Sequence, residues 1–378
     1  MKVDIIGAGI GGLTTAIALG QKGIDTRIYE QARQLKSAGA GIIIANNAMQ
    51  VYEKLGLRGF LEDSGNPISS MNITTTGLKR ISKIDLKYFE RKYKVKNVAI
   101  HRGKLQAVLM DHLDSSKLFL DHKLSNLQSK GNQYKLSFEN GVEVDAEVII
   151  GADGLNSTVR ERVFPGKTIR NARQICWRGV TDFELSAQYQ SELNEAWGKA
   201  IRFGFVQIAP RRVYWYALKT FNQSANEFKV EDIEAYFQSF SPLVQEIIRS
   251  TDKAQIHTAE IEDLHPIHKW YENKVCLLGD AAHATTPNMG QGACQAIEDA
   301  WVMAEYLERH EAEEAFKRFQ KHRMRKAHHV VNTSWTLGKM AHLTHPVLIT
   351  LRNTFMRMAP EAANRMQSSK MFRLAPIS

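Results

Sequence analysis

The sequence predicts an α/β protein in which a Rossmann-like nucleotide-binding domain is interleaved with a mixed β-sheet domain and followed by C-terminal helices. Three observations support this fold class. Three segments rich in glycine and acidic residues, far apart in a chain of 378 residues, each follow a short apolar run that is typical of a buried strand. The region between the last two segments alternates apolar and polar residues, as antiparallel strands do. The last part of the chain has the spacing of amphipathic helices.

The first segment lies at residues 7–12, where the sequence reads Gly-Ala-Gly-Ile-Gly-Gly. It follows the apolar run at 3–6 and opens a stretch with apolar residues at helical spacing, so it marks a strand-to-helix turn. Glycine there permits the tight turn, the approach of backbone N–H groups to a pyrophosphate, and the close packing of the helix. We expect the following glycines to lie beside a dinucleotide: Gly7, Gly9, Gly11 and Gly12.

Three acidic residues stand where a bound dinucleotide would need hydrogen-bond acceptors. Glu30 ends a second predicted strand at 26–29, about twenty residues after the glycines, where a ribose needs an acceptor. Asp153 and Asp280, in the second and third segments, each come shortly after a predicted strand, at 148–150 and at 275–278 respectively. Because ligands bind at the carboxyl ends of strands in open α/β sheets, all three acids indicate one site.

The three segments together resemble the motifs of the class A flavoprotein monooxygenases, which include para-hydroxybenzoate, salicylate and urate hydroxylases and zeaxanthin epoxidase. The glycine fingerprint is the first motif. Residues 151–160, Gly-Ala-Asp-Gly-Leu-Asn-Ser-Thr-Val-Arg, resemble the family's Asp-Gly motif. Residues 279–292, which begin Gly-Asp-Ala-Ala-His, resemble its Gly-Asp motif. The resemblance extends over nearly the whole chain and implies that the dinucleotide is FAD.

The resemblance also implies cofactor contacts at individual positions. Asp280 would accept hydrogen bonds from the ribityl hydroxyls of FAD. The glycines after Pro287 would leave the N-terminus of a following helix pointing at the flavin ring, where its dipole favours the reduced state. A strand expected at 39–43 would pass close to the flavin. Besides the four glycines, the expected contacts are Glu30, Gln31, Gly41, Ile43, Arg102, Leu124, Asp153, Asp280, Pro287, Gly290, Gln291, Gly292 and Ala293.

The activity that the resemblance implies is that of an FAD-dependent monooxygenase. It would insert one oxygen atom of O₂ into a small aromatic or heterocyclic substrate through a flavin C4a-hydroperoxide. No second glycine fingerprint is visible, so NAD(P)H would bind transiently as the reductant. The expected catalytic residues are Arg202 and Tyr214, on two predicted strands that would face the flavin, together with Pro287. Some relatives have an acid directly after that proline, where this chain has Asn288.

Three other functions stay open on the sequence alone. An FAD-dependent epoxidase or reductase of an isoprenoid or lipid substrate would use the same motifs, and the stretch at 347–351 with Arg352 and Arg357 would then rest against a membrane or lipid. A flavin halogenase is disfavoured because the Trp-x-Trp-x-Ile-Pro signature is absent. A flavin-binding protein without turnover is the non-enzymatic alternative. Oxygen uptake separates them, because only a monooxygenase consumes O₂ with substrate-stimulated oxidation of NAD(P)H.

The predicted domains alternate along the chain. They are an FAD-binding domain at 1–68, 98–168 and 264–310, a substrate-domain sheet at 69–97 and 169–263, and a C-terminal helical region at 311–378. The clearest strands of the second domain lie at 200–206 and 212–218, with a hairpin from Ser70 to Ile84 around Gly77. In the family that the chain resembles, this sheet roofs the substrate side of the flavin.

The net charge, the distribution of basic residues and the cysteine spacing argue against nucleic acid and metal as partners. The formal net charge is +10, but the basic residues are scattered and no signature of a nucleic-acid-binding fold accompanies them, so we expect no nucleic acid. The densest basic run, at 317–326, has the spacing of an amphipathic helix with a solvated basic face. Cys176, Cys276 and Cys294 have no metal-binding spacing, so we expect no metal and a reducing compartment.

Location and assembly follow from what the sequence lacks. No cleavable signal precedes the first predicted strand, and no apolar run reaches the roughly 18 residues that span a bilayer. We therefore expect a cytoplasmic protein whose partners are a small-molecule substrate and O₂. A monomer and a homodimer both fit, and peripheral contact with a membrane is left open.

Overall fold

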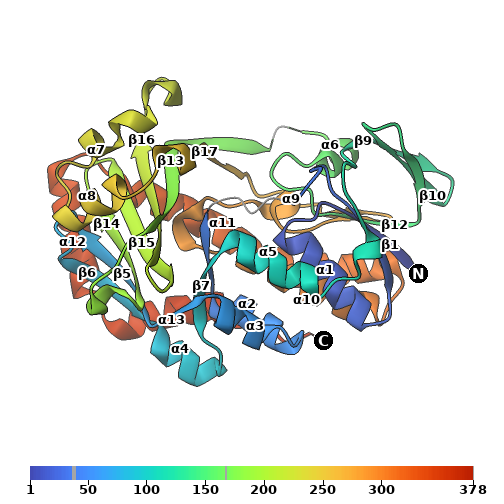
Figure 1. Ribbon diagram of the computed structural model, residues 1–378. Coiled ribbons are helices and arrows are strands. Elements are labelled where there is room, and N and C mark those ends of the chain that lie inside the picture. The colour runs from blue at the N-terminus through green and yellow to red at the C-terminus, as the bar shows by residue number, and fades with distance from the viewer. Residues whose placement is uncertain (36–39, 167, 378) are drawn as a thin grey trace.

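The computed structural model describes residues 1–35, 40–166 and 168–377. It has the mixed α/β architecture that the sequence predicts, with one sheet at each end of an elongated molecule (Figure 1). Among the described residues, one sheet has six strands in the order β18-β19-β12-β1-β2-β8. The bounds of these strands are Tyr271–Glu272, Val275–Leu277, Val148–Gly151, Lys2–Ile6, Asp25–Tyr29 and Leu118–Phe119.

The central strands of this sheet run parallel, which is the arrangement of a nucleotide-binding domain. β1 pairs in parallel with both β2 and β12, and β12 pairs in parallel with β19. The strands predicted at 26–29, 148–150 and 275–278 are therefore confirmed. Helices cover the sheet, and the residues at 148–150 and 275–278 are all apolar and buried, whereas the strand at 26–29 begins with the polar residues Thr26 and Arg27. Two of these helices, α1 (Ile10–Gln21) and α10 (Gly292–Leu307), pack against each other.

The second sheet has seven strands among the described residues, in the order β17-β13-β16-β15-β14-β5-β6. It is antiparallel except where β14 pairs in parallel with β5. The predicted hairpin is β5 and β6, and the two predicted strands are β15 and β16. The bounds in sheet order are His257–Leu264, Ile169–Asp182, Arg212–Thr220, Ile201–Ala209, Glu192–Trp197, Ser70–Thr75 and Arg80–Asp85.

The two faces of this sheet have different roles because side chains alternate along each strand. One face carries a large apolar core that includes Trp177, Phe203 and Trp215, which α7 (Ile233–Tyr236) and α8 (Pro242–Arg249) cover. The opposite face carries Arg202 and Tyr214, one residue out of step with that core, and it turns toward the other lobe. The strand pattern thus separates a packing face from a face that is polar and aromatic.

Two smaller sheets and several helices complete the region between and around the large sheets. The strands are β3 (Gly41–Ile44), β7 (Asn97–His101) and β4 (Asn66–Ile68) in one sheet, and β9 (Leu124–Lys130), β10 (Gln133–Phe138) and β11 (Glu143–Ala146) in the other. Gly39, at the start of the strand expected at 39–43, lies outside the described residues. The helices are α2 (Asn46–Lys54), α3 (Arg58–Ser64), α4 (Leu86–Tyr93), α5 (Arg102–Asp111), α6 (Thr158–Val163) and α9 (Asp280–His283).

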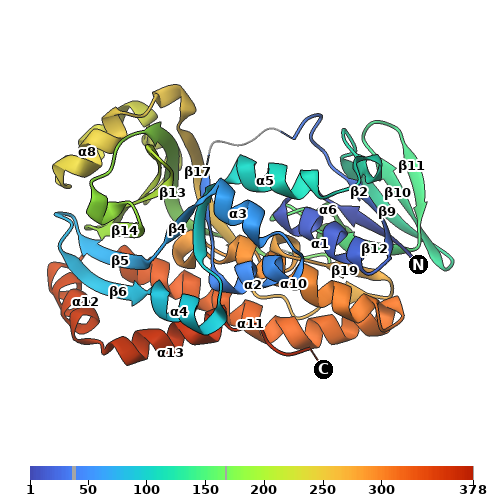
Figure 2. The same cartoon turned by 60° about the horizontal axis from the view of Figure 1, so that its bottom comes forward.

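The C-terminal helices connect the two lobes along one side of the molecule (Figure 2). The long helix α11 (Ala312–Ala341) packs against α10, and α12 (Pro346–Met358) and α13 (Glu361–Phe372) lie against β6. No helix in the described ranges is both long enough and apolar enough to cross a membrane. The domain boundaries given above stay a prediction.

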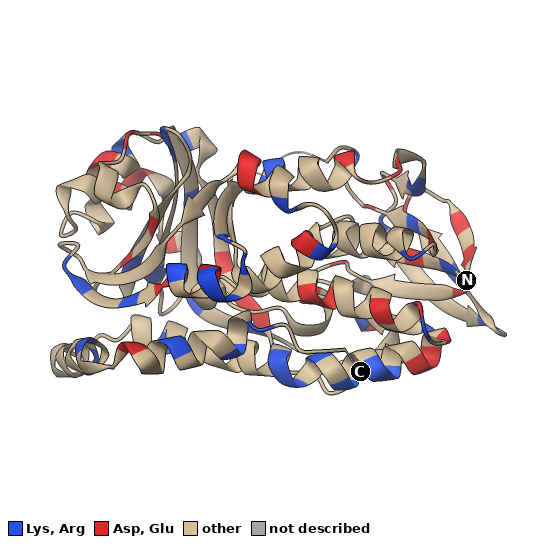
Figure 3. Ribbon diagram, turned by 90° about the horizontal axis from the view of Figure 1, so that it is seen from below, with Lys and Arg blue, Asp and Glu red and all other residues tan. Residues whose placement is uncertain are grey.

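The basic run at 317–326 forms part of α11, but the expectation of a solvated basic face was wrong at two of its positions. Arg323 is 1% exposed, and its guanidinium lies 2.7 Å from both Glu298 and Asp299 of α10. Lys326 also pairs with Glu298, at 2.6 Å. Arg323 and Lys326 therefore point toward these acids of α10 and not toward solvent, because a buried carboxylate is stable only when a cation is paired with it. Elsewhere, Lys and Arg lie scattered among Asp and Glu over both lobes (Figure 3).

Candidate active site

The glycine turn after β1 is crowded by protein atoms at Gly7 and Gly12 and is open at Gly9. A Cβ at Gly12 would lie 2.0 Å from the carbonyl oxygen of Gly7, and Gly7 itself has a φ of +105°. A Cβ at Gly9 would meet no atom within 4 Å. Gly9 also starts α1, whose first turn has no side-chain cap and no acidic residue. The first N–H groups of this helix are therefore available to an anion such as a pyrophosphate.

Glu30 lies at the end of β2, beside this turn. Its carboxylate accepts hydrogen bonds from the N–H groups of Ala8 (2.8 Å) and Ala32 (2.9 Å), one on each oxygen. These bonds fix the carboxylate next to the glycine turn and leave lone pairs for further donors such as ribose hydroxyls. Gln31 is exposed next to it, and Leu124 is buried at the start of β9.

Asp153 serves the loop in which it lies. One carboxylate oxygen accepts a hydrogen bond from the Ser157 hydroxyl at 2.5 Å, and the other accepts one from the Val159 N–H at 3.1 Å. Arg160 of the same motif is buried and donates to the carbonyl oxygen of Ala281 at 3.0 Å. The Asp-Gly motif and the Gly-Asp motif are thus joined directly, which sequence reasoning did not foresee.

A cluster of buried charged residues, Glu298, Asp299 and Arg323, stabilises the Gly-Asp turn. Gly279 has a φ of +60°, and its N–H donates to Asp299 at 3.0 Å. The same Asp299 oxygen lies 2.5 Å from Nε2 of His283, which therefore supports the loop. Burial alone would raise the pKa of Asp299, but His283 and Arg323 lower it to about 2. The carboxylate is thus kept ionised where it anchors the turn.

Asp280, one residue further on, faces the other way, into a cavity. No hydrogen bond or ion pair to its carboxylate occurs within residues 1–35, 40–166 and 168–377. The carboxylate touches open space in the cavity although protein surrounds it. This burial raises its pKa, while His283 and Arg102 act in the opposite direction. An ionised acceptor in this position requires donors, and a polyhydroxyl chain supplies them.

The loop after Asp280 brings a second uncapped helix N-terminus to the same cavity. Pro287 starts a single turn of 3₁₀ helix, and Gly290 has a φ of +60°, which a residue with a side chain rarely adopts. The helix α10 then begins at Gly292 with no side-chain cap and no acid in its first turn. Gly290, Gln291, Gly292 and Ala293 all line the cavity, with Gly41 and Ile43 of β3 opposite them. The helix dipole favours negative charge there.

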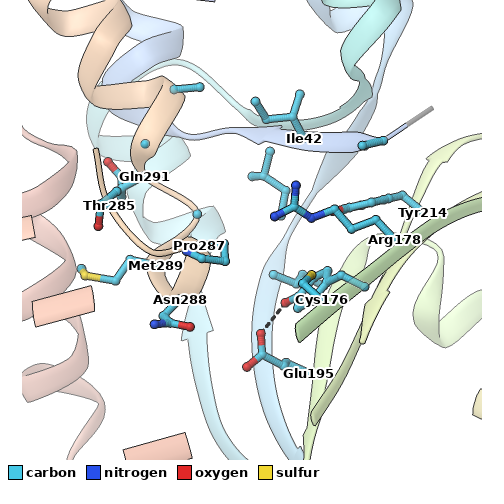
Figure 4. Close-up of a pocket in the computed structure, with 18 of the residues that line it drawn as sticks. Ile42, Cys176, Arg178, Glu195, Tyr214, Thr285, Pro287, Asn288, Met289 and Gln291 are labelled. Carbon is cyan, nitrogen blue, oxygen red and sulfur yellow. Dashed lines mark hydrogen bonds between the residues drawn. The ribbon is translucent and has the colours of Figure 1, made fainter. Parts of the chain in front are cut away.

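The cavity has a volume of about 240 Å³, and its far wall is the polar face of the seven-stranded sheet. The side chains of Arg178 and Tyr214 extend together from this sheet toward Pro287 and Ile42 (Figure 4). The ring of Tyr214 packs on Gly41, where a Cβ would come within 2.3 Å of it. Burial raises the pKa of Tyr214, so its hydroxyl stays protonated at neutral pH. The predicted catalytic residues therefore line one cavity with the predicted cofactor contacts of β3, of α5 and of residues 280–293. The glycines after β1, together with Glu30, Gln31, Leu124 and Asp153, are not among the residues that line it.

Arg202 reaches the cavity wall as a buried and paired residue rather than as a solvated one. It is 1% exposed and forms an ion pair with Glu195 at 3.1 Å. Its guanidinium also donates to the side-chain oxygen of Asn288, so it ties the sheet to the loop after Pro287. Its Nε has no hydrogen-bond partner within the described part of the chain.

Two charged residues of the wall were missed in the sequence. Glu195 of β14 accepts hydrogen bonds from Trp197 (2.6 Å), Arg202 and Tyr216, so it joins three strands on this face. Arg178 of β13 lines the cavity, and the described residues offer it no acidic partner within 4 Å. Alternation in β13 and β14 was the only available signal, since it places both residues out of step with the apolar core.

Arg102 starts α5, lines the cavity and is exposed in it. The described residues provide no ion pair or hydrogen bond for its guanidinium. The glycine turn after β1 and this cavity together fit FAD. The turn, open at Gly9, and the uncapped N-terminus of α1 match a pyrophosphate, while Asp280 and the uncapped N-terminus of α10 in the cavity match a ribityl chain and a flavin ring.

Comparison with known proteins agrees with this fit. The family described as FAD binding domain matches residues 1–334. Over 362 residues the chain is 32% identical to aurachin C monooxygenase/isomerase of Stigmatella aurantiaca, covering 95% of this chain and 94% of that protein. Over 380 residues it is 30% identical to 2-heptyl-3-hydroxy-4(1H)-quinolone synthase of Pseudomonas aeruginosa, covering 98% of each. The crystal structure of Klebsiella pneumoniae HpxO complexed with FAD and uric acid has the same fold, with a TM-score of 0.90, 24% identity, and coverage of 98% and 97%.

Proposed function

Because the chain belongs to the FAD binding domain family and is a flavoprotein monooxygenase, we propose that it hydroxylates the ring of a nitrogen heterocycle held in the cavity between α10 and the seven-stranded sheet. The observation that carries this proposal is that Asp280, the start of α10 and a wall of polar and aromatic side chains line one cavity. The relatives named above, which include a quinolone synthase, support a heterocyclic substrate. The alternative of an isoprenoid epoxidase or reductase is not favoured.

Bound FAD would supply the redox chemistry, with NAD(P)H as reductant and O₂ as the source of the inserted atom. The residues of the chain hold the cofactor. Glu30 and Asp280 accept from the hydroxyls of the cofactor, and the N-terminus of α1 binds its pyrophosphate. The N-terminus of α10 stabilises negative charge in the cavity by up to about 2 kcal/mol.

The sheet residues hold and orient the substrate. Tyr214 stacks or hydrogen-bonds with the ring, and Arg178 donates to an oxygen substituent, because its guanidinium faces the cavity without an acidic partner. Arg202 acts through Asn288, whose oxygen it binds, and so fixes the loop of Pro287 against the sheet. A ring held at reaction distance and shielded from water is what this chemistry requires.

The test is oxidation of NAD(P)H by the purified yellow holoenzyme, followed together with oxygen uptake. The proposal expects both rates to rise on addition of a nitrogen heterocycle such as a 4-quinolone, with one O₂ consumed per NAD(P)H. Substrate-stimulated oxidation of NAD(P)H without oxygen uptake would indicate the reductase instead. No stimulation by any ring compound would leave only flavin binding.

Assembly and location are part of the proposal as well. Along α12, Val347, Leu351, Phe355 and Met358 are exposed at helical spacing and form an apolar stripe. We propose that this stripe rests on a lipid surface, and vesicle co-sedimentation tests it, with a homodimer contact as the alternative outcome. A cytoplasmic location is supported by the three cysteines, which are free and buried.

A further inference from the structure

A second cavity adjoins the first on the side away from Asp280. Its volume is about 220 Å³, and it is enclosed by β5, β6 and β14 together with the 3₁₀ turn at 287–289 and helices α11, α12 and α13. Met71, Leu193, Glu195, Asn288 and Met289 line both cavities, so the two are separated by side chains and not by backbone layers. A molecule in the first cavity can therefore extend into the second.

The surface of the second cavity is mainly apolar, although uncharged polar side chains such as Asn72, Thr333 and Gln367 also line it, and it offers no free charge. Four methionines line it, at 71, 289, 356 and 371, and unbranched thioethers adapt to the shape of an apolar guest. Glu195 is the one ionisable residue among the described lining residues, and both of its oxygens already accept hydrogen bonds. Asn288 is also engaged, through Arg202 and the backbone of Ser334.

The cavity does not belong to the cofactor site. Asp280, Arg102 and the glycines at 290 and 292 line the first cavity and not the second. Part of its outer wall comes from Met356 and Met371, which lie beyond residue 334, where the match to the FAD binding domain family ends. The C-terminal helices therefore contribute to the shape of this cavity.

We propose that the second cavity holds an aliphatic chain attached to the substrate ring, so that the substrate is an amphiphile with its ring in the first cavity and its tail in the second. This inference rests on the proposed function for the position of the ring. The apolar part of this cavity lacks van der Waals contacts while it is empty, and an alkyl chain supplies them. Each methylene buried there raises affinity about threefold to fourfold.

The experiment compares binding of 2-methyl-4(1H)-quinolone and 2-heptyl-4(1H)-quinolone to the holoenzyme by calorimetry, without NAD(P)H. We expect the heptyl compound to bind at least about tenfold more tightly, because several methylenes become buried. Met356→Phe fills the cavity and should abolish this gain while affinity for the methyl compound stays unchanged. Met358→Phe, on the same helix but 76% exposed, is the matched control and should keep the gain.

Equal affinity for the two compounds in the wild type, no binding of the heptyl compound, or a gain that survives both Met356→Phe and a second filling variant, Leu337→Phe, would overturn the inference. The proposed function fails separately. If the heptyl compound binds with the expected gain but neither compound stimulates oxidation of NAD(P)H, the inference about the second cavity is supported and the proposed hydroxylation of this ring is contradicted.

Discussion

The buried charge cluster that supports the Gly-Asp turn and the cavity that Asp280 faces both contain acidic and arginine side chains. In the cluster these side chains are paired with one another, whereas two of those in the cavity are not. In the cluster, Arg323 is paired with both Glu298 and Asp299, and all three are almost fully buried. In the cavity, Asp280 and Arg178 have no charged partner within the described part of the chain. Gly279, held by the cluster, and Asp280, which faces the cavity, are adjacent in the chain.

This difference separates structural from ligand-binding charge. A charge removed from water is stable only where a partner compensates it. Within the cluster the partner is another side chain, so the cluster shapes the turn. In the cavity Asp280 and Arg178 are open to water or to a bound molecule, and unpaired charges in such a cleft indicate a functional site. Variants at the two regions should therefore fail in different ways.

The largest expected effect is on stability, from breaking the cluster. Arg323→Met leaves Glu298 and Asp299 without their main cation, and should lower the free energy of unfolding by about 3–5 kcal/mol. Urea unfolding followed by circular dichroism measures it. Arg318→Met is the control, because Arg318 lies on the same helix in an exposed pair with Glu314 and should change little. An unchanged midpoint for Arg323→Met would mean that the cluster does not support the fold.

Removing the unpaired acid should instead weaken the cofactor and spare the fold. Asp280→Ala loses a charged acceptor of hydroxyl groups, which is worth about 1.5–3 kcal/mol, or roughly a tenfold to hundredfold rise in the Kd of FAD. Fluorescence titration of the apoprotein with FAD measures this. Asp63→Ala, which removes an exposed carboxylate on α3 outside the cavity, should bind FAD normally. Wild-type affinity in Asp280→Ala would remove Asp280 from the site.

Lowering the pH should destabilise the cluster by protonating Asp299. Its pKa is about 2, below its ordinary value of 3.8, so its ionised form adds stability that is complete above the ordinary value and is lost as the pH falls through the folded value. The difference in unfolding free energy between the wild type and Asp299→Asn should then shrink by roughly 2 kcal/mol between pH 5 and pH 2. A difference that stays constant over this range would show that Asp299 is not held ionised by its neighbours.

The smallest expected effect concerns the substrate wall. Arg202→Gln and Tyr214→Phe should retain FAD but lower the fraction of NAD(P)H oxidation that yields product about tenfold or less, releasing hydrogen peroxide, because a misplaced ring no longer captures the oxygen. Peroxide and product are assayed in parallel. Arg212→Gln, at the exposed end of the same sheet, is the control. Full coupling in both wall variants would make Arg202 and Tyr214 purely structural.

The part of the site that the sequence predicted is the part fixed by local rules. Glycine spacing determines the turn at 7–12, and strand ends determine where Glu30 and Asp280 lie, so these residues were found without the fold. Strands β5, β6, β15 and β16 of the second sheet were also predicted, since alternation is a local pattern, whereas β13, β14 and β17 were not located individually. Loop contacts such as the bond from Arg160 to Ala281 join motifs far apart in the chain and leave no such pattern.

What was missed depends on pairings between distant strands and helices. Glu195 and Arg178 enter the cavity because β14 and β13 take particular positions and faces in the sheet. Arg323 is buried because α11 places it against Glu298 and Asp299 of α10, a helix register that the basic run does not encode. A charged residue looks alike in the sequence whether it is solvated, paired in a core, or aimed into a cavity.

The measurement that tests the central claim most directly is incorporation of heavy-isotope oxygen by the holoenzyme with NAD(P)H. The substrate is 2-heptyl-4(1H)-quinolone, within a panel of nitrogen heterocycles. We predict that the hydroxylated product of at least one of these rings carries one oxygen atom from labelled O₂ and none from labelled water. NAD(P)H consumption should match product formation. Oxygen taken from water, or NAD(P)H oxidation that no ring compound stimulates, would contradict the claim that this cavity supports monooxygenation.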